Sequence, residues 1–164
     1  MPTKATYNAE QLVIQLGMGV VRQPFLRQMP WQVSHDGRPM ILPRMGSITL
    51  NVKIGDSVYG MAGDHIEPGV TIKNPGAEEN SALQLLTCIG NPARIISGDA
   101  KGAEGFVTGF HGGVDDLMLY FPRDVLERMT LEDKIQIRMQ GRGMQIHGFE
   151  DSVHCISMGP ELFD

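Results

Sequence analysis

The stretch RIISGDAKGAEGFVTGFHGGVDDLMLYFP, residues Arg94–Pro122, decides the fold of this chain. Short apolar runs alternate in it with glycines, which stand at positions 98, 102, 105, 109, 112 and 113. The runs are rich in β-branched, aromatic and other large apolar residues, which favour strands over a flexible linker. The glycines are therefore expected at turns and bulges, where a positive φ or a close backbone approach is required.

Glycine and proline also interrupt the apolar runs in the rest of the chain. Its 20 Gly and 10 Pro among 164 residues leave apolar runs too short for most helices but suited to strands. Residues 47–54 and 134–140 alternate apolar and polar side chains, so one face of each is expected to be buried and the other wet. We expect a single mainly β domain over residues 1–164, an antiparallel barrel-like fold with one short helix from Pro122 to about Met129. The expected strands cover 12–16, 40–42, 47–54, 57–61, 70–73, 83–89, 93–96, 105–110, 116–121, 134–140, 145–146 and 153–156, and the polar segment 74–81 is expected to be a surface loop.

Charge and cysteine usage disfavour several classes of function. The chain has 14 Lys+Arg against 19 Asp+Glu, and its basic residues are scattered, which disfavours nucleic acid as a partner. Cys88 and Cys155 belong to no CxxC motif, so neither a zinc knuckle nor a redox pair is indicated, and both are expected to be small buried residues. No apolar run approaches the roughly 20 residues of a membrane span, and the first residues do not form a signal-peptide pattern. We expect a cytoplasmic protein with no membrane partner.

The loop GDHIEPGV, Gly63–Val70, is the sharpest chemical candidate. It brings Asp64, His65 and Glu67 together between glycines and a proline, and in an extended loop His65 and Glu67 point the same way. An imidazole and a carboxylate so placed could bind a divalent metal or transfer protons, with a further ligand from His111, Asp115 or Asp116. Alternatively, Asp64 caps the turn, Glu67 faces water and His65 hydrogen-bonds a backbone carbonyl.

The segment HGGVDD, His111–Asp116, is a second compact polar loop. Gly112 and Gly113 would let a backbone approach a ligand closely, and their N–H groups could form an anion-binding nest. Equally, the two glycines fit a two-residue hairpin turn with Asp115 and Asp116 as solvated flanks. If folding brings the two loops together, the catalytic candidates are His65, Glu67 and His111, the metal candidates are Asp64, His65, Glu67 and His111, and the ligand-binding candidates are Gly112, Gly113, Asp115 and Asp116.

The turn GDAKGAEGFV, preceded by RIIS, is similar to the KOW motif of SH3-like barrels in ribosomal and transcription proteins. The similarity implies a tight turn that joins two strongly bent barrel strands. The RNA-binding role of that motif is disfavoured here, because the turn carries one lysine on an acidic chain.

Three longer segments resemble a prokaryotic family catalogued as a domain of unknown function (serial number four-four-three-eight): ITLNVKIGDSVYGMAGDHIEPGV, CIGNPARIISGDAKGAEGFVTGFHGG and GPELFD. The resemblance spans most of the chain from about Met40 onward. It implies a mainly β, barrel-like N-terminal unit, and its typical members continue into a second domain that is absent here. We therefore expect either a homo-oligomer or a partner chain that supplies the missing domain.

These observations lead to one main functional hypothesis and two others. The main hypothesis is a metal- or anion-dependent enzyme subunit that hydrolyses a small amide or amino-acid-like substrate, with a divalent metal as the candidate cofactor. The alternative is a non-enzymatic oligomeric β-barrel scaffold or binding module, in which the same loops make subunit contacts. A KOW-type nucleic-acid-binding module is the third.

Overall fold

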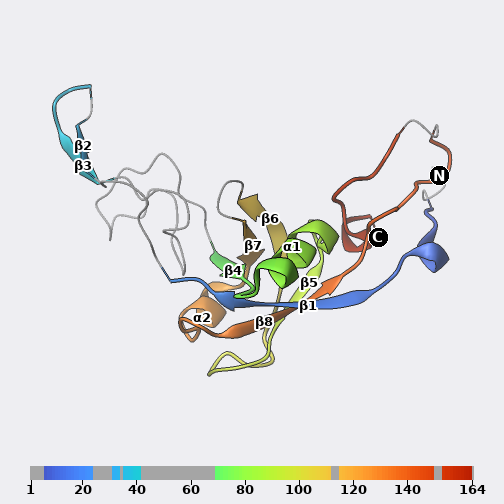
Figure 1. Ribbon diagram of the computed structural model, residues 1–164, viewed down its shortest axis with the longest axis horizontal. Coiled ribbons are helices and arrows are strands. Elements are labelled where there is room, and N and C mark those ends of the chain that lie inside the picture. The colour runs from blue at the N-terminus through green and yellow to red at the C-terminus, as the bar shows by residue number, and fades with distance from the viewer. Residues whose placement is uncertain are drawn as a thin grey trace.

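The structure is a computed structural model that describes residues 6–23, 31–33, 35–41, 69–111, 115–149 and 153–163. Antiparallel strands close a barrel in the order β1-β4-β7-β6-β5-β8 (Figure 1). A separate two-stranded sheet pairs β2 (Trp31–Val33) with β3 (Pro39–Ile41). The prediction of a mainly β, antiparallel barrel-like domain is confirmed. The barrel strands are β1 (Gln15–Val21), β4 (Val70–Lys73), β5 (Pro92–Ile95), β6 (Glu104–His111), β7 (Asp116–Tyr120) and β8 (Lys134–Met139).

The closure of the barrel is uneven around its circumference. β1 pairs with β8 from Gln15 to Val20, but it pairs with β4 only at Val20 and Val21. Helix α1 (Ala77–Leu86) follows β4. It packs on β1 where β1 has no β4 partner (Figure 1). The contact is close, since a Cβ added at Gly17 would lie 2.8 Å from Cδ1 of Leu83. Helix α1 therefore packs beside the part of β1 that β4 leaves unpaired, with Leu83 against Gly17.

The barrel interior is filled by large apolar side chains from every barrel strand and from both α-helices. The alternation predicted for residues 134–140 is confirmed, because Ile135, Ile137 and Met139 of β8 are buried and Lys134 is exposed. The short helix α2 (Arg123–Leu126) begins after Pro122, as predicted, and adds Val125 and Leu126 to the core. The core also includes Val21, Ile72, Leu83, Ile95, Val107, Leu117, Leu119 and Phe121.

Helix α1 corrects the sequence-based prediction for residues 74–89. The expected surface loop over 74–81 and the expected strand over 83–89 are both wrong, because Ala77–Leu86 is helical. SALQLLT can be read as a strand because Leu83, Leu85 and Thr87 alternate with other residues. The helix forms because Ala, Glu, Gln and Leu are good helix formers. In addition, Asn74 Oδ1 accepts a hydrogen bond from the Gly76 N–H at 2.9 Å just before the first turn.

Strand β1 also differs from its prediction. The expected strand 12–16 is shifted toward the C-terminus as Gln15–Val21, since Gly17 and Gly19 do not break it. Both glycines face the barrel interior, where Leu83 and Ile72 fill the space that their side chains would need. The expected strands 145–146 and 153–156 are not formed; Ile146 makes an isolated bridge with Tyr7, and Met158 makes one with Ile89. The expected strands 47–54 and 57–61 lie outside the described residues.

The segment that decided the sequence-based prediction does form turns and bulges. Its turn joins β5 to β6, which pair with each other, and Gly98 and Gly102 adopt φ of 67° and 93° in it. The β6–β7 pairing shifts register between Val107 and Gly109, as a bulge does. The similarity of this turn to the KOW motif stays a prediction.

The two terminal segments lie side by side, at the same side of the molecule in Figure 1. The rings of Tyr7 and Phe163 meet edge to face, with centroids 5.3 Å apart. Short 3-10 helices occur in both segments, η1 (Ala9–Gln11) and η2 (Pro160–Leu162). Among the helices of the described part of the chain, none is long and apolar enough to cross a bilayer.

Candidate functional site

Three of the predicted site residues lie within the described structure. His111 is the last residue of β6, Asp115 precedes β7, and Asp116 is the first residue of β7. The other candidates lie outside the described residues: Asp64, His65, Glu67, Gly112 and Gly113. The barrel surface next to residues 112–114 carries polar side chains of its own.

Four polar residues from neighbouring strands and strand ends lie together, with Asp116 among them. His111 and Asp116 face each other across the β6–β7 ladder. Ile72 of β4 pairs with Leu117, which places Lys73 beside Asp116 in the adjacent strand. Arg22 follows β1, and its Nε lies 3.3 Å from Oδ1 of Asp116. We call the set the polar cluster: Arg22, Lys73, His111 and Asp116.

Asp116 is the buried centre of the polar cluster. Its side chain has no exposed surface, and Nε of Arg22, 3.3 Å from Oδ1, is its ion-pair and hydrogen-bond partner. Burial therefore raises the pKa of Asp116 above its ordinary value of 3.8, because the charged form loses its hydration. The positive charges of Arg22 and Lys73, and to a smaller extent the nearby His111, oppose that rise. Such a carboxyl group is suited to exchange a proton with a bound molecule.

This electrostatic environment predicts a pH dependence of stability. A raised pKa in the folded state means that the native protein holds the Asp116 proton more tightly than the unfolded chain does. The resulting stabilisation is complete below pH 3.8 and is lost as pH rises through the native pKa. We expect wild type to lose free energy of unfolding relative to Asp116→Asn as pH rises above 3.8, as measured by urea unfolding at a series of pH values.

The control for this measurement is Asp124→Asn, because the Asp124 side chain is 78% exposed on α2. Its difference from wild type should stay nearly constant over the same pH range. A flat difference for Asp116→Asn, or one of opposite slope, would contradict the raised pKa.

Hydrogen bonds from helix α1 fix the backbone of Asp115. It adopts a left-handed φ of 57°, and its carbonyl oxygen accepts hydrogen bonds from the side-chain amides of Asn80 and Gln84, each at 3.0 Å. Helix α1 thus fixes the chain where it enters β7, immediately before the buried Asp116. The exposed Asp115 side chain keeps its ligand-binding role only as a prediction.

The strand register bears on the prediction of a joint site. Residues 63–68 lead into β4, whose first residue, Val70, pairs with Leu119 near the end of β7. His111, by contrast, pairs with Asp116 at the beginning of β7. The two predicted loops therefore join the described barrel at opposite ends of β7. A shared site for His65 and His111 stays a prediction, and it requires residues 63–68 to reach back along the barrel.

Two members of the polar cluster, Arg22 and Lys73, were missed by the sequence analysis. Each stands directly at the end of an apolar strand, after LGMGVV in β1 and after VTI in β4, which is the one local signal in the sequence. Neither residue lies near His111 or Asp116 in the sequence. Their proximity to Asp116 depends on the pairing of β4 with β1 and β7, which composition does not reveal.

The predicted metal site is untested by the described residues. Within them, no group of three or more His, Cys, Asp or Glu side chains is arranged to hold a metal ion. The predicted metal ligands Asp64, His65 and Glu67 lie outside that part of the chain. His111, the fourth predicted ligand, is buried beside Asp116, where it contributes to the charge of the polar cluster.

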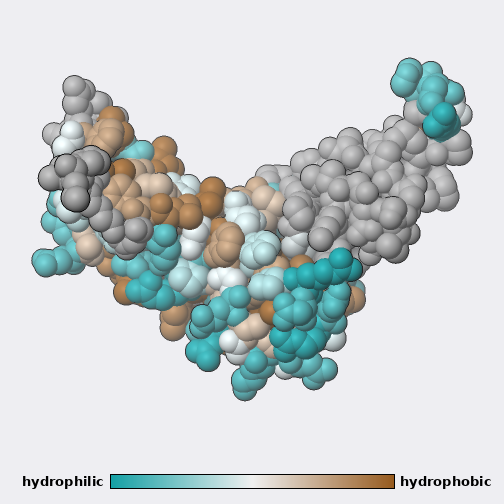
Figure 2. All heavy atoms as spheres, turned by 180° about the vertical axis from the view of Figure 1, so that it is seen from behind, coloured by the Kyte–Doolittle hydropathy of each residue, from teal (hydrophilic) through white to brown (hydrophobic). Residues whose placement is uncertain are grey.

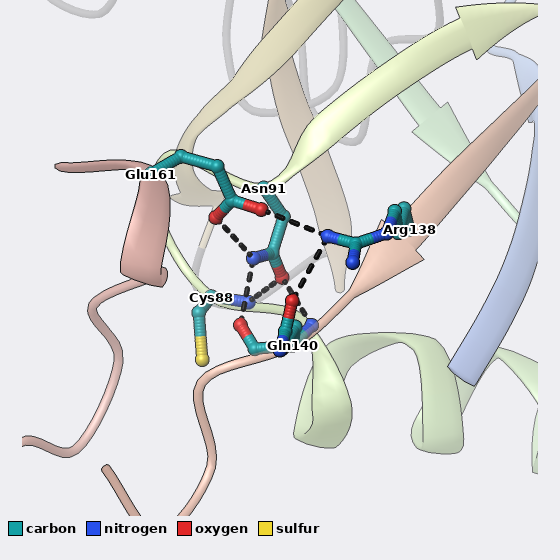
Figure 3. A network of polar contacts seen from close by, with 5 residues as sticks. All are labelled: Cys88, Asn91, Arg138, Gln140 and Glu161. Atoms are coloured by element: carbon teal, nitrogen blue, oxygen red, sulfur yellow. Dashed lines mark hydrogen bonds and ion pairs between the residues drawn. The ribbon is translucent and has the colours of Figure 1, made fainter. Parts of the chain in front are cut away.

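A second polar network, centred on Asn91, joins the C-terminal segment to the barrel (Figure 3). Asn91 is fully buried, and its Oδ1 accepts hydrogen bonds from the backbone N–H groups of Cys88 at 2.8 Å and Gln140 at 3.2 Å. Its Nδ2 donates to the Gln140 carbonyl at 2.7 Å and approaches Glu161 Oε2 at 3.4 Å. Arg138 binds the other oxygen of Glu161 at 3.2 Å. These polar groups bind each other, so the network is structural.

The two cysteines carry no indicated chemistry. Both are free thiols; Cys88 is fully buried, as predicted, whereas Cys155 is only half-buried. Burial raises the pKa of the Cys88 thiol, although the charge of Arg142 opposes the rise. The thiol is therefore disfavoured as a nucleophile at neutral pH, because only the thiolate reacts readily.

Comparison with known proteins identifies relatives without an assigned activity. Residues 31–164 match the family model described as domain of unknown function (DUF4438), N-terminal. The crystal structure of TM1086 is 40% identical, covers 98% of this chain and superimposes with a TM-score of 0.82. The chain spans 56% of the length of that protein. A comparison with curated proteins finds no match.

Proposed function

This chain belongs to the family described as domain of unknown function (DUF4438), N-terminal, and we propose that it is an anion-dependent enzyme subunit whose reaction centres on Asp116. The observation that carries the proposal is a fully buried carboxylate with two cationic side chains, Arg22 and Lys73, beside it. Most buried carboxylates have their hydrogen-bonding capacity satisfied by donors. In Asp116, the charge and the hydrogen bond of Arg22 do not offset the effect of burial, so the pKa of the carboxyl group stays raised. Its arrangement is more typical of a reactive group than of a structural one.

The charges of the polar cluster indicate an anionic substrate. The positive charges of two side chains, Arg22 and Lys73, face the single carboxylate of Asp116, so the cluster retains positive charge when Asp116 is ionised. A carboxylate group of a small amino-acid-like molecule would complement that charge. Arginine is also suited to bind a carboxylate through two parallel hydrogen bonds.

The proposed reaction is hydrolysis of an amide bond. Asp116, in its ionised form, accepts a proton from a water molecule, whose oxygen attacks the carbonyl carbon of the amide. The protonated Asp116 then gives that proton to the departing amine as the C–N bond breaks, so the carboxylate is regenerated. A raised pKa favours both steps, because it brings the carboxyl group closer to the pH at which the protein works. Arg22 and Lys73 position the substrate and take no part in the proton transfer.

Hydrolysis and binding can be tested separately with a panel of N-acyl amino acids and amino-acid amides. We expect Asp116→Asn to lower the release of free amine by about 100-fold, since general acid–base catalysis contributes about that much or more. Lys73→Gln should weaken binding of the carboxylate-bearing compounds by about tenfold, as measured by thermal shift. Arg123→Gln on α2, whose side chain is 64% exposed, is the matched control and should change neither quantity. Unchanged turnover in Asp116→Asn would refute the role of that carboxyl group.

A non-enzymatic oligomeric scaffold is the alternative. It is favoured by exposed apolar side chains on the terminal segments, among them Val13 at 70% and Ile156 at 71% exposure. Figure 2 shows apolar surface gathered on the side of the molecule that carries these segments. Surfaces of this kind often mark contacts with another protein. The same amine-release assay distinguishes the two, since a scaffold would give no turnover that depends on Asp116. A cytoplasmic location is proposed with either function.

A further inference from the structure

An open strand edge borders a groove between β1 and helix α1. The groove has a volume of about 470 Å³. Leu16 and Met18 of β1 line one side, Glu79 and Leu86 of α1 line the other, and Asn74 closes one end near Met18. The groove is separate from the polar cluster, and none of the cluster residues lines it.

The pairing of β1 fixes the direction of its backbone groups. The N–H of Val21 donates to the Asp133 carbonyl next to β8 at 2.9 Å, whereas the N–H of Arg22 donates to Thr71 of β4 at 3.0 Å. Backbone N–H and C=O groups of successive strand residues point to opposite sides. Leu16 and Met18 therefore direct theirs away from β8, as Arg22 does, and into the groove.

One of these groove-facing groups has a partner and the others do not. Asn74 Nδ2 donates to the carbonyl oxygen of Met18 at 2.8 Å. Within the described part of the chain, no hydrogen bond engages the N–H or C=O of Leu16 or the N–H of Met18 on this side. The groove therefore presents two donors and one acceptor with the spacing of a strand edge.

Natural proteins usually protect an open strand edge, and although helix α1 borders this one, the strand itself lacks two common protective devices. Residues 12–21, LVIQLGMGVV, contain neither a charged residue nor a proline, both of which discourage pairing with another chain. The apolar side chains here are also exposed, to 49% in Ile14 and 65% in Leu16. An edge that is uncharged, apolar and unpaired is suited to accept another strand.

We propose that the groove binds an extended segment of a second polypeptide, which adds to β1 as a further strand. A residue of that segment opposite Leu16 would exchange two backbone hydrogen bonds with it, and a neighbouring carbonyl would accept from Met18. Asn74 marks one end of the added strand, because its side chain already occupies the Met18 carbonyl. Strand addition of this kind derives affinity from main-chain bonds and specificity from alternate side chains.

Charge complementarity specifies the segment further. Glu79 is the one charged side chain that lines the groove among the described residues, so the segment is expected to carry Lys or Arg at the end near Asn74. A second copy of β1 would not meet that requirement, since residues 12–21 contain no basic residue. TM1086 carries polypeptide beyond the region that matches this chain, which offers one source of such a segment.

The test uses random decapeptides displayed on phage and selected on the full chain. Ala82→Trp fills the groove, because Ala82 is an exposed residue of α1 that lines it. Leu16→Pro removes one groove-facing N–H and leaves the β1–β8 hydrogen bonds intact, as proline can do at a strand edge. Leu85→Trp is the matched control, since Leu85 is 65% exposed on α1 but does not line the groove. Thermal unfolding of each variant establishes that it is folded.

We expect enriched peptides that alternate apolar and polar residues and contain Lys or Arg. Ala82→Trp and Leu16→Pro should each weaken their binding by at least about tenfold, while Leu85→Trp leaves it unchanged. Bound peptide should also slow hydrogen exchange of the Leu16 and Met18 amides. The proposal is overturned if selection enriches no peptide, or if the peptides bind folded Leu16→Pro as tightly as wild type. A concentration-dependent dimer that Ala82→Trp disrupts, detected by light scattering, would overturn it in favour of a second copy.

Discussion

Asn91→Ala is expected to lower the free energy of unfolding by about 4 kcal/mol, because it leaves one buried and two partly buried backbone groups without their partner. The Asn91 side chain satisfies the N–H of Cys88 and both the N–H and the C=O of Gln140. An unsatisfied buried polar group costs about 1–3 kcal/mol, and water that enters the space left by the side chain recovers part of the sum. Urea unfolding at neutral pH measures the difference.

Asn8→Ala provides a matched control for this prediction. Asn8 also makes three side-chain hydrogen bonds, to Gln11, to the Gly143 carbonyl and from the Gln145 N–H, but at a more exposed site. Water can replace those partners, so the loss should stay near about 1 kcal/mol. Similar losses for the two variants would show that the burial of the Asn91 network contributes little. A loss in Asn91→Ala that comes with a smaller m-value would indicate that the C-terminal segment detaches separately.

Gly105→Ala is expected to cost about 3 kcal/mol, the second largest effect. A Cβ at this position would lie 2.1 Å from the carbonyl oxygen of Tyr120 and 2.7 Å from the ring of Phe121. Overpacking of a core costs about 1–3 kcal/mol, and the upper value applies here because a strand carbonyl cannot rotate away as a side chain can. The nearest strands, β6 and β7, would have to separate. Denaturant unfolding again provides the measurement.

Gly102→Ala separates this steric effect from the effect of backbone angle. Gly102 lies in the turn just before β6 with a φ of 93°, but nothing lies within 4 Å of a Cβ added there. The substitution should therefore cost only the strain of a left-handed residue, about 1–2 kcal/mol. If Gly102→Ala destabilises the protein more than Gly105→Ala does, then the glycines of this segment are required for turn conformation and not for close packing.

The sequence predicted the barrel because its signals are local. The alternation in residues 134–140 and the glycine-bounded run 104–111 each reflect which face of a strand is buried. That property depends on residues that are neighbours in the sequence. Gly17 and Gly19 misled the prediction for β1, since a glycine that makes room for Leu83 or Ile72 cannot be told from one that ends a strand. The contact that explains each glycine comes from a distant segment.

Only part of the candidate site could be predicted from the sequence, because the rest depends on contacts between distant segments. His111 and Asp116 are close in sequence and stood out as a compact polar loop. The burial of Asp116 and its partners Arg22 and Lys73 arise from strand order, which no local pattern encodes. Asp116 was therefore expected as a ligand-binding residue or a solvated flank, whereas its side chain is fully buried.

The pairing of β1 with β8 has a consequence for the order of assembly. Strands β4 to β8 belong to the later part of the chain and follow one another closely, whereas β1 must find β8 across almost the whole sequence. Contacts between distant segments are slow to form, because a long loop has to be closed first. Arg22 directly follows β1, so it reaches Asp116 only when the first strand has docked. The charge environment of Asp116 is thus a property of the closed barrel, and a chain that has folded everything except its first strand has no complete polar cluster.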